Sequence, residues 1–182
     1  MIGYLTKPIY HLLGWKLKGH YPRELKHLIL IVAPHTSNWD FPLGLLVKFW
    51  LRMDDVSYYA KASLFKGPLG LFLKSINGIP VDRSSNHNFV SQAVQDFKEK
   101  EIHRILITPE GTRKRRDSFK SGFYYIAKEA NVPILPIIFD YGLKEIRMLE
   151  PLHVRGNGPA EIEEIRSLFI GIKGKNPENG IF

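Results

Sequence analysis

Leu28-Ile29-Leu30-Ile31-Val32-Ala33 is the stretch that decides the fold. This continuous apolar run, rich in β-branched residues, is typical of a strand buried on both faces of a parallel sheet. Further strands are expected over 56–60, 79–81, 104–107 and 134–139, and a β-ribbon over 144–154. Expected helices cover 40–53, 67–75, 88–100, 120–130 and 161–170. The alternation predicts an α/β fold, a single domain with a largely parallel sheet flanked by helices.

Size and composition fit one globular domain over residues 1–182. Apolar residues make up 44% of the chain and charged residues 24%, so extensive disorder is excluded. There is no cysteine, which excludes disulfides, thiolate metal sites and cysteine nucleophiles. The longest apolar runs are too short to span a bilayer, and the first residues lack the features of a signal peptide.

The charge is positive and unevenly distributed. The formal net charge is +8, and residues 61–120 carry 12 basic and 6 acidic side chains. Such an excess predicts an anionic partner, which is a nucleic acid, an anionic lipid or a phosphorylated substrate. Charge alone does not distinguish these three.

Residues 1–20 predict an amphipathic N-terminal helix. Four apolar side chains share one of its faces: Leu5, Ile9, Leu12 and Leu13. Positive charge comes from Lys7, Lys16 and Lys18. This pattern fits a helix lying on an anionic membrane surface. The alternative, which periodicity alone favours, is a helix packed on the core of its own domain.

His35 and Asp40 follow the first buried strand. In parallel sheets, functional sites gather at the carboxyl ends of strands. An Asp five residues after the His, at the start of a helix, can fold back and accept a hydrogen bond from the imidazole. That contact would fix the tautomer that a general base needs. The alternatives are a hydrogen-bonded loop histidine and, for Asp40, a helix N-cap, which is compatible with the contact.

A second polar loop follows the strand at 104–107. Gly111 permits a tight turn, Arg113 offers a planar fork suited to phosphate, and Glu110 can orient a donor or a hydroxyl. Residues 114–116 are interpreted as a solvated basic loop. Arg83 lies beyond another short strand, where the alternative is a surface ion pair of the adjacent Asp82.

Four blocks in this order resemble the glycerolipid acyltransferase family, which includes the lysophosphatidic acid acyltransferases. His35 and Asp40 match its H-x-x-x-x-D motif, and Pro109-Glu110-Gly111-Thr112-Arg113 matches its third block. Residues 78–83 are similar to its second block and residues 132–137 to its fourth, and the spacer 119–122, which contains Lys120, also resembles the family. The resemblance covers residues 27–140.

The resemblance implies a role for each matched residue. His35 would be the general base and Asp40 its orienting partner. The residues expected to bind the substrate are Arg83, Glu110, Gly111, Thr112, Arg113 and Lys120. Arg83 and Arg113 would hold a phosphate. The family uses no metal or redox cofactor.

The resemblance also implies the partners: acyl-CoA or acyl carrier protein as donor, and a phosphorylated lipid as acceptor. We expect a peripheral enzyme on the cytoplasmic face of a membrane. Without a cysteine or a G-x-S-x-G motif, direct acyl transfer is the simpler mechanism. The alternatives are a different acceptor, such as a lyso-aminolipid, and a basic nucleic-acid-binding domain. Since no nucleic-acid motif is present, a nucleic-acid partner is not expected.

Overall fold

A mostly parallel sheet forms the centre of the molecule. The computed structural model describes the backbone of residues 2–81 and 86–182 and the side chains of residues 6–81 and 89–182. Within these residues the sheet has seven strands in the order β1-β7-β6-β2-β5-β3-β4. Their bounds are β1 Lys16–Lys18, β2 His27–Ala33, β3 Val56–Lys61, β4 Gly78–Val81, β5 His103–Ile107, β6 Ile134–Asp140 and β7 Glu145–Met148. Strands β2 to β6 are parallel, whereas β7 runs antiparallel to β6 and pairs in parallel with β1.

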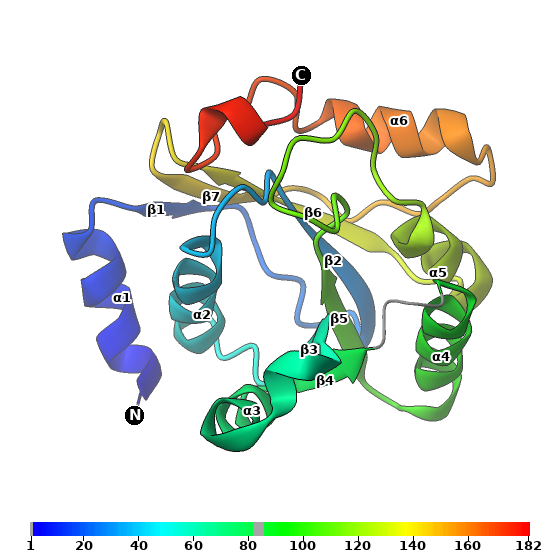
Figure 1. Ribbon diagram of the computed structural model, residues 1–182, viewed down its shortest axis with the longest axis horizontal. Helices are drawn as coiled ribbons and strands as arrows, with labels where there is room; N and C mark the ends of the chain where they lie inside the picture. Colours follow the sequence, from blue (N-terminus) through cyan, green and yellow to red (C-terminus); the bar gives the residue numbers. More distant parts are fainter. Residues whose placement is uncertain (1, 82–85) are drawn as a thin grey trace.

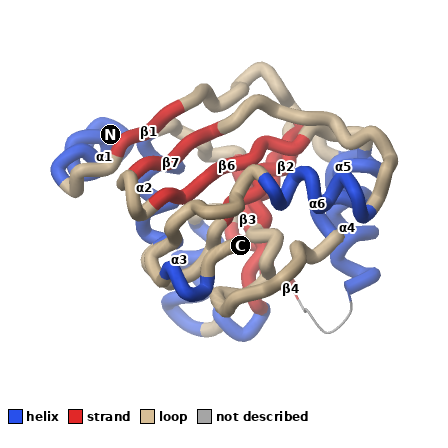
Figure 2. The backbone as a smooth tube through the Cα atoms, turned by 90° about the horizontal axis from the view of Figure 1, so that it is seen from above, coloured by secondary structure: helices blue, strands red, loops and turns tan. Residues whose placement is uncertain are grey.

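Helices cover both faces of this sheet, so the molecule has three layers (Figure 2). The helices are α1 Ile2–Leu12, α2 Asp40–Trp50, α3 Gly67–Ser75, α4 Asn86–Glu99, α5 Gly122–Ala130 and α6 Pro159–Ser167, with short 3-10 helices η1 Ala62–Phe65 and η2 Pro177–Asn179. In Figure 1, α1 and α2 lie on one side of the sheet and α4 and α5 on the other. The predicted α/β domain with flanking helices is confirmed.

The central strand β2 contributes to both cores, which explains its unbroken apolar sequence. Ile29, Ile31 and Ala33 belong to the core cluster that also contains side chains of α4, α5 and α6. The alternate residues of β2 belong to the opposite cluster, with side chains of α1 and α2; they are Leu28, Leu30 and Val32. A strand buried on both faces cannot show the polar alternation of a half-exposed strand.

The N-terminal helix is present, and it packs on its own domain. Thr6 and Tyr10 of α1 are buried, and Tyr10 belongs to the core cluster under α2. Ile9, Leu12 and Leu13 remain 46%, 88% and 49% exposed. One face of the helix therefore serves the core, as the alternative interpretation expected, and an apolar stripe stays open. The Leu5 side chain lies outside the described residues.

Two elements differ from expectation. Residues 16–18, expected within an amphipathic helical segment, form the edge strand β1, and Lys18 forms an ion pair with Glu145 at 2.8 Å. The β-ribbon expected over 144–154 is wrong. This segment forms the single strand β7 and an isolated bridge between Leu152 and Ile134, because its partner is β6 rather than a second half of itself.

None of the described helices combines the length and hydropathy needed to span a bilayer.

Phe169, which follows α6, ties the C-terminal part of the chain to the core. Its ring is fully buried and lies 5.7 Å from the ring of Phe119. We expect Phe169→Ala to lower the free energy of unfolding by about 3–5 kcal/mol, because the cavity it leaves cannot collapse completely. Urea denaturation followed by circular dichroism measures this. The neighbouring Leu168 is 40% exposed, so Leu168→Ala is the matched control and should change stability little. Equal losses in the two variants would contradict this packing.

Candidate active site

Three adjacent parallel strands bring the predicted polar loops together. In the sheet, β2 lies between β6 and β5. The chain leaves β2 into the loop that contains His35, leaves β5 into the loop that contains Glu110, and leaves β6 at Asp140. Since the three strands are parallel, these exits share one edge of the sheet. Figure 1 shows the loops after β2 and β5 close together at the upper end of the sheet.

His35 and Asp40 form the predicted contact. The Nδ1 atom of His35 lies 2.9 Å from Oδ2 of Asp40. Because a carboxylate only accepts hydrogen bonds, this contact assigns the proton to Nδ1 and leaves a lone pair on Nε2. The Asp40 side chain is 4% exposed, whereas that of His35 is 18% exposed. The imidazole is therefore held from the buried side and remains accessible at the other, as a general base requires.

Asp40 is not the N-cap of α2. It is the first residue of the helix, and Trp39 occupies the N-cap position without a side-chain cap. The carboxylate of Asp40 turns back to the preceding loop, where Oδ2 also accepts the backbone N–H groups of Thr36 and Ser37 at 3.1 and 3.0 Å. The N-cap expectation is wrong because the loop amides, rather than those of the helix, satisfy this carboxylate.

Tyr141 completes the environment of Asp40. Its hydroxyl donates to Oδ1 of Asp40 at 2.8 Å. Burial, together with the hydrogen bond to this carboxylate, raises the pKa of Tyr141 above its ordinary value, so the residue stays a donor. Its ring packs edge-on against Trp15 at 4.8 Å. Sequence reasoning missed Tyr141, although its position directly after β6, at the shared edge of the sheet, was an available signal.

Glu110 lies on the other side of His35. Its Oε1 atom accepts the backbone N–H of His35 at 2.8 Å, and only 4% of the residue is exposed. Burial raises the pKa of Glu110 to about 7, and the contacts with His35 partly oppose this rise. The Oε2 atom is buried and has no hydrogen-bond partner among the described groups. A pKa near neutrality means that small changes of pH alter the charge of this buried carboxyl.

A large cavity opens beside the loop that follows β5 and contains Glu110. Its volume is about 820 Å³, and Gly111 and Lys120 line it. Gly111 has a left-handed φ of +64°, a backbone conformation that favours glycine, and the end of the Lys120 side chain lies next to it. The apolar part of the wall includes Tyr59, Val81, Phe89, Val90, Leu106, Ile107, Phe119 and Phe123. A long apolar wall beside a cationic group suits an amphiphilic ligand.

The other residues predicted to bind the substrate are not gathered around this cavity. Thr112 is half-buried and Arg113 is exposed, and neither belongs to the cavity lining. Arg116 does line the cavity, although it was interpreted as part of a solvated basic loop. Arg115 instead lies over the ring of Phe182 at 4.7 Å. Arg83 lies outside the described residues.

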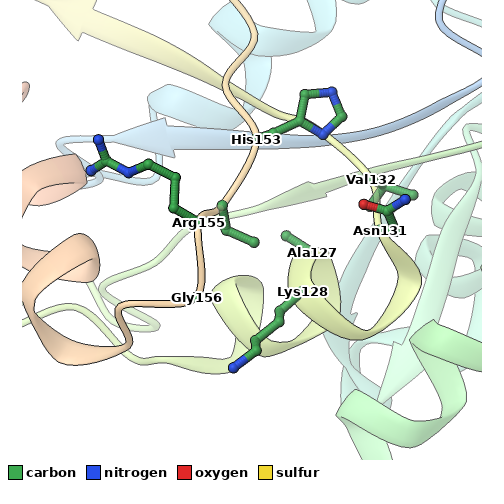
Figure 3. A pocket seen from close by; sticks show the side chains of 8 residues that line it. Ala127, Lys128, Asn131, Val132, His153, Arg155 and Gly156 are labelled. Atoms are coloured by element: carbon green, nitrogen blue, oxygen red, sulfur yellow. The ribbon is translucent and has the colours of Figure 1, made fainter.

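A second hollow has a different character (Figure 3). It measures about 140 Å³ and lies between the end of α5 and residues 153–156, before the amino end of β6 and so away from His35. Three basic side chains line it, but in Figure 3 Lys128, His153 and Arg155 point in different directions. Arg155 is also paired with Glu161 at 3.5 Å. This hollow therefore lacks the convergent polar groups of a ligand site. No three His, Asp or Glu side chains among the described residues gather as a metal site.

Comparisons with known proteins show which sequences this chain resembles. The chain is 26% identical over 209 residues to 1-acyl-sn-glycerol-3-phosphate acyltransferase beta of Homo sapiens, covering 99% of this chain and 74% of that protein. It is 25% identical over 168 residues to a 1-acyl-sn-glycerol-3-phosphate acyltransferase of Haemophilus influenzae, covering 81% of this chain and 68% of that protein. The corresponding enzyme of Streptococcus pneumoniae is 26% identical over 168 residues, with coverages of 86% and 62%. No solved structure matches the chain.

The family model described as Acyltransferase matches residues 16–140. This range contains the central strands β2, β5 and β6 and both of the loops that meet at His35. With the motif residues, the sheet edge and the match all coinciding, the chain belongs to the acyltransferase family.

Proposed function

We propose that the protein is an O-acyltransferase that moves a fatty acyl group from acyl-CoA or acyl carrier protein to a hydroxyl of a lysophosphatidate-like phosphorylated glycerolipid. The observation that carries this proposal is the 2.9 Å contact between His35 Nδ1 and the buried Asp40 carboxylate. The names of the relatives, all 1-acyl-sn-glycerol-3-phosphate acyltransferases, support the acceptor. Residues 1–182 would form one acyltransferase domain.

In the proposed mechanism, His35 is the general base. Its Nε2 atom accepts the proton of the acceptor hydroxyl while the oxygen attacks the thioester carbonyl. The new C–O bond forms, the C–S bond breaks, and the imidazolium returns the proton to the leaving thiolate. Asp40 holds the ring and stabilises its protonated form. General-base catalysis contributes roughly 10²–10⁴-fold, and alignment of the two substrates supplies much of the remainder.

The 820 Å³ cavity supports an amphiphilic substrate. We assign its apolar wall to hydrocarbon and its Lys120 and Arg116 side to the anionic head of the same molecule. Gly111 lines the cavity, Glu110 and Thr112 would contact the acceptor from the same loop, and Arg113, with Arg83, would hold the acceptor phosphate. A lyso-aminolipid acceptor would not need this group of cations.

Membrane contact is part of the proposal. The exposed stripe of Ile9, Leu12 and Leu13 can enter the interface of an anionic leaflet. Lys7 and Lys16 would bind the anionic headgroups of the lipids. Lys18 would contribute less, since it already forms an ion pair with Glu145. The enzyme would act as a peripheral protein on the cytoplasmic face of the membrane.

A second apolar surface lies on η1 and α3. It consists of Leu64, Leu69, Leu71 and Phe72, from η1 and α3, which are 45–72% exposed. The ring of Phe41 at the start of α2 contacts that of Tyr58, whose hydroxyl donates to the carbonyl of Leu73 in α3. Tyr58 therefore links α3 to the start of α2, and the surface on η1 and α3 is the alternative site of membrane contact.

The first test concerns the base. We expect His35→Ala to fold normally and to lose roughly 10²-fold or more of kcat, because the hydroxyl proton loses its acceptor. Release of thiol from acyl-CoA in the presence of lysophosphatidate measures turnover. His153→Ala, at the far hollow, is the matched control and should keep its activity. Near wild-type turnover in a folded His35→Ala protein would contradict the proposed mechanism.

The second test concerns the acceptor phosphate. Arg113→Lys keeps the charge but loses the bidentate fork, so kcat/KM for lysophosphatidate should fall by roughly 10-fold. The KM for the acyl donor should change little. Arg115→Lys is the control, since that guanidinium already lies over Phe182. An Arg113→Lys effect confined to the donor would overturn the phosphate assignment, and equal use of a lyso-aminolipid would favour the alternative acceptor.

The third test concerns the membrane. The double variant Ile9→Asp/Leu13→Asp should lose co-sedimentation with anionic vesicles and activity on a membrane-embedded acceptor, while keeping activity on a short-chain, water-soluble one. Wild-type binding should weaken with salt, because each Lys near the surface contributes about 1 kcal/mol of screened attraction.

Ile102→Asp/Leu168→Asp is the matched control for this test, since both side chains are similarly exposed and lie outside the stripe. A folded Ile9→Asp/Leu13→Asp protein that still sediments with vesicles would exclude the stripe. Loss of binding in Leu69→Asp/Phe72→Asp would then assign the contact to the second surface.

A further inference from the structure

The C-terminal segment returns to the loop that holds His35. After α6 the chain forms a closed loop, in which the N–H of Gly171 donates to the carbonyl of Ile181 at 3.1 Å. Ile181 is buried in the core cluster beneath α5 and α6. In Figure 1 this segment, drawn in red, lies at the same end of the sheet as the loop between β2 and α2. It also lies beyond residues 16–140, which the family model matches.

Asn176 makes two hydrogen bonds to Thr36, the neighbour of His35. Its backbone N–H donates to Thr36 Oγ1 at 3.1 Å, and its side-chain Nδ2 donates to the Thr36 carbonyl at 2.9 Å. Thr36 is only 1% exposed, so these donors replace water that it cannot reach. The approach is close enough to require Gly174, where a Cβ would lie 2.5 Å from Thr36 Oγ1.

The same stretch also contacts the other side of Asp40. The carbonyl of Lys173 accepts the backbone N–H of Tyr141 at 2.8 Å. Tyr141 donates its hydroxyl to Oδ1 of Asp40, and Thr36 donates its N–H to Oδ2. Residues 173–176, which we call the strap, therefore hold two of the residues that donate to the Asp40 carboxylate, Tyr141 at Oδ1 and Thr36 at Oδ2.

We infer that Asn176 is a positioning residue for the reaction, acting through Thr36 on the His35–Asp40 pair. This inference rests on the proposed function. Thr36 lies between His35 and Ser37 in the chain. Its carbonyl belongs to the same peptide group as the N–H of Ser37, which also donates to Asp40. Asn176 holds both the carbonyl and the hydroxyl of Thr36, which prevents this peptide group from rotating. A rotation would move the imidazole of His35 away from the Asp40 carboxylate. Small displacements of a base cost far more in turnover than in substrate affinity.

A purely stabilising strap would behave differently. It would lower the free energy of unfolding in proportion to the bonds removed, and it would leave kcat unchanged in molecules that remain folded. A positioning strap lowers kcat while the KM values for donor and acceptor stay close to those of the wild type. The ratio of these two effects is therefore the decisive measurement.

The test compares four single variants of the full chain, with an acyl-CoA donor and a short-chain lysophosphatidate acceptor. Asn176→Ala removes the side-chain donor, and Thr36→Val removes the hydroxyl acceptor with almost no change of shape. We expect each to lower kcat by roughly 10-fold, and the double variant by up to roughly 100-fold. Thr36→Ser restores the hydroxyl and should restore turnover. Asn179→Ala, in the same tail, removes the side-chain oxygen that accepts the N–H of Arg115 and keeps the backbone N–H that donates to the Asn176 carbonyl, so it should keep full turnover.

Amide hydrogen exchange at Thr36 and Ser37 gives a readout that does not depend on activity. Both N–H groups should exchange faster in Asn176→Ala and in Thr36→Val, and not in Asn179→Ala. If the wild type transfers no acyl group to any acceptor, the proposed function fails, and the exchange rates still decide the structural part of the inference. Should Asn176→Ala not fold, Thr36→Val compared with Thr36→Ser makes the same test. Unchanged kcat and unchanged exchange in folded Asn176→Ala, or equal losses in Asn179→Ala, would overturn the inference.

Discussion

The carboxylate of Asp40 is buried, and the hydrogen bonds donated to it compensate for the water it has lost. Oδ2 accepts from the imidazole of His35 and from the N–H groups of Thr36 and Ser37, and Oδ1 accepts from the hydroxyl of Tyr141. A buried carboxylate without such donors costs several kcal/mol. These donors therefore stabilise the buried carboxylate, and the carboxylate in turn orients the histidine.

The topology of the sheet explains how distant residues reach Asp40. Since β2 lies between β5 and β6, the loops that follow these three strands meet although they are far apart in sequence. Tyr141 is 101 residues from Asp40, and Glu110 is 75 residues from His35. The crossovers between parallel strands supply the helices that cover the sheet, so the same arrangement that builds the two cores also concentrates polar groups at one edge.

Local patterns in the sequence predicted what depends on neighbouring residues. The apolar run at 28–33 indicated the central strand, and the spacing of His35 and Asp40 indicated their contact. The capping role of Asp40 was predicted wrongly, because propensity does not show which amides a carboxylate will face. The contacts of Asn176 with Thr36 span 140 residues, and no periodicity or motif marks such a pairing. Edge strand β1 was missed because three residues of sequence Lys-Leu-Lys carry no strand pattern.

Two carboxyl groups, those of Asp40 and Glu110, contact His35, and they differ in the hydrogen-bond donors that surround them. Asp40 faces only donors and therefore acts as an acceptor. Glu110 is equally buried, but its Oε2 has no hydrogen-bond partner among the described residues, and burial raises its pKa to about 7. Environments that separate two neighbouring carboxyls in this way divide their roles. Asp40 accepts the Nδ1–H of the imidazole and holds the ring. Glu110 can lose its charge near neutral pH beside the cavity that Gly111 lines, where a neutral carboxyl does not repel an anionic head group and a charged one does.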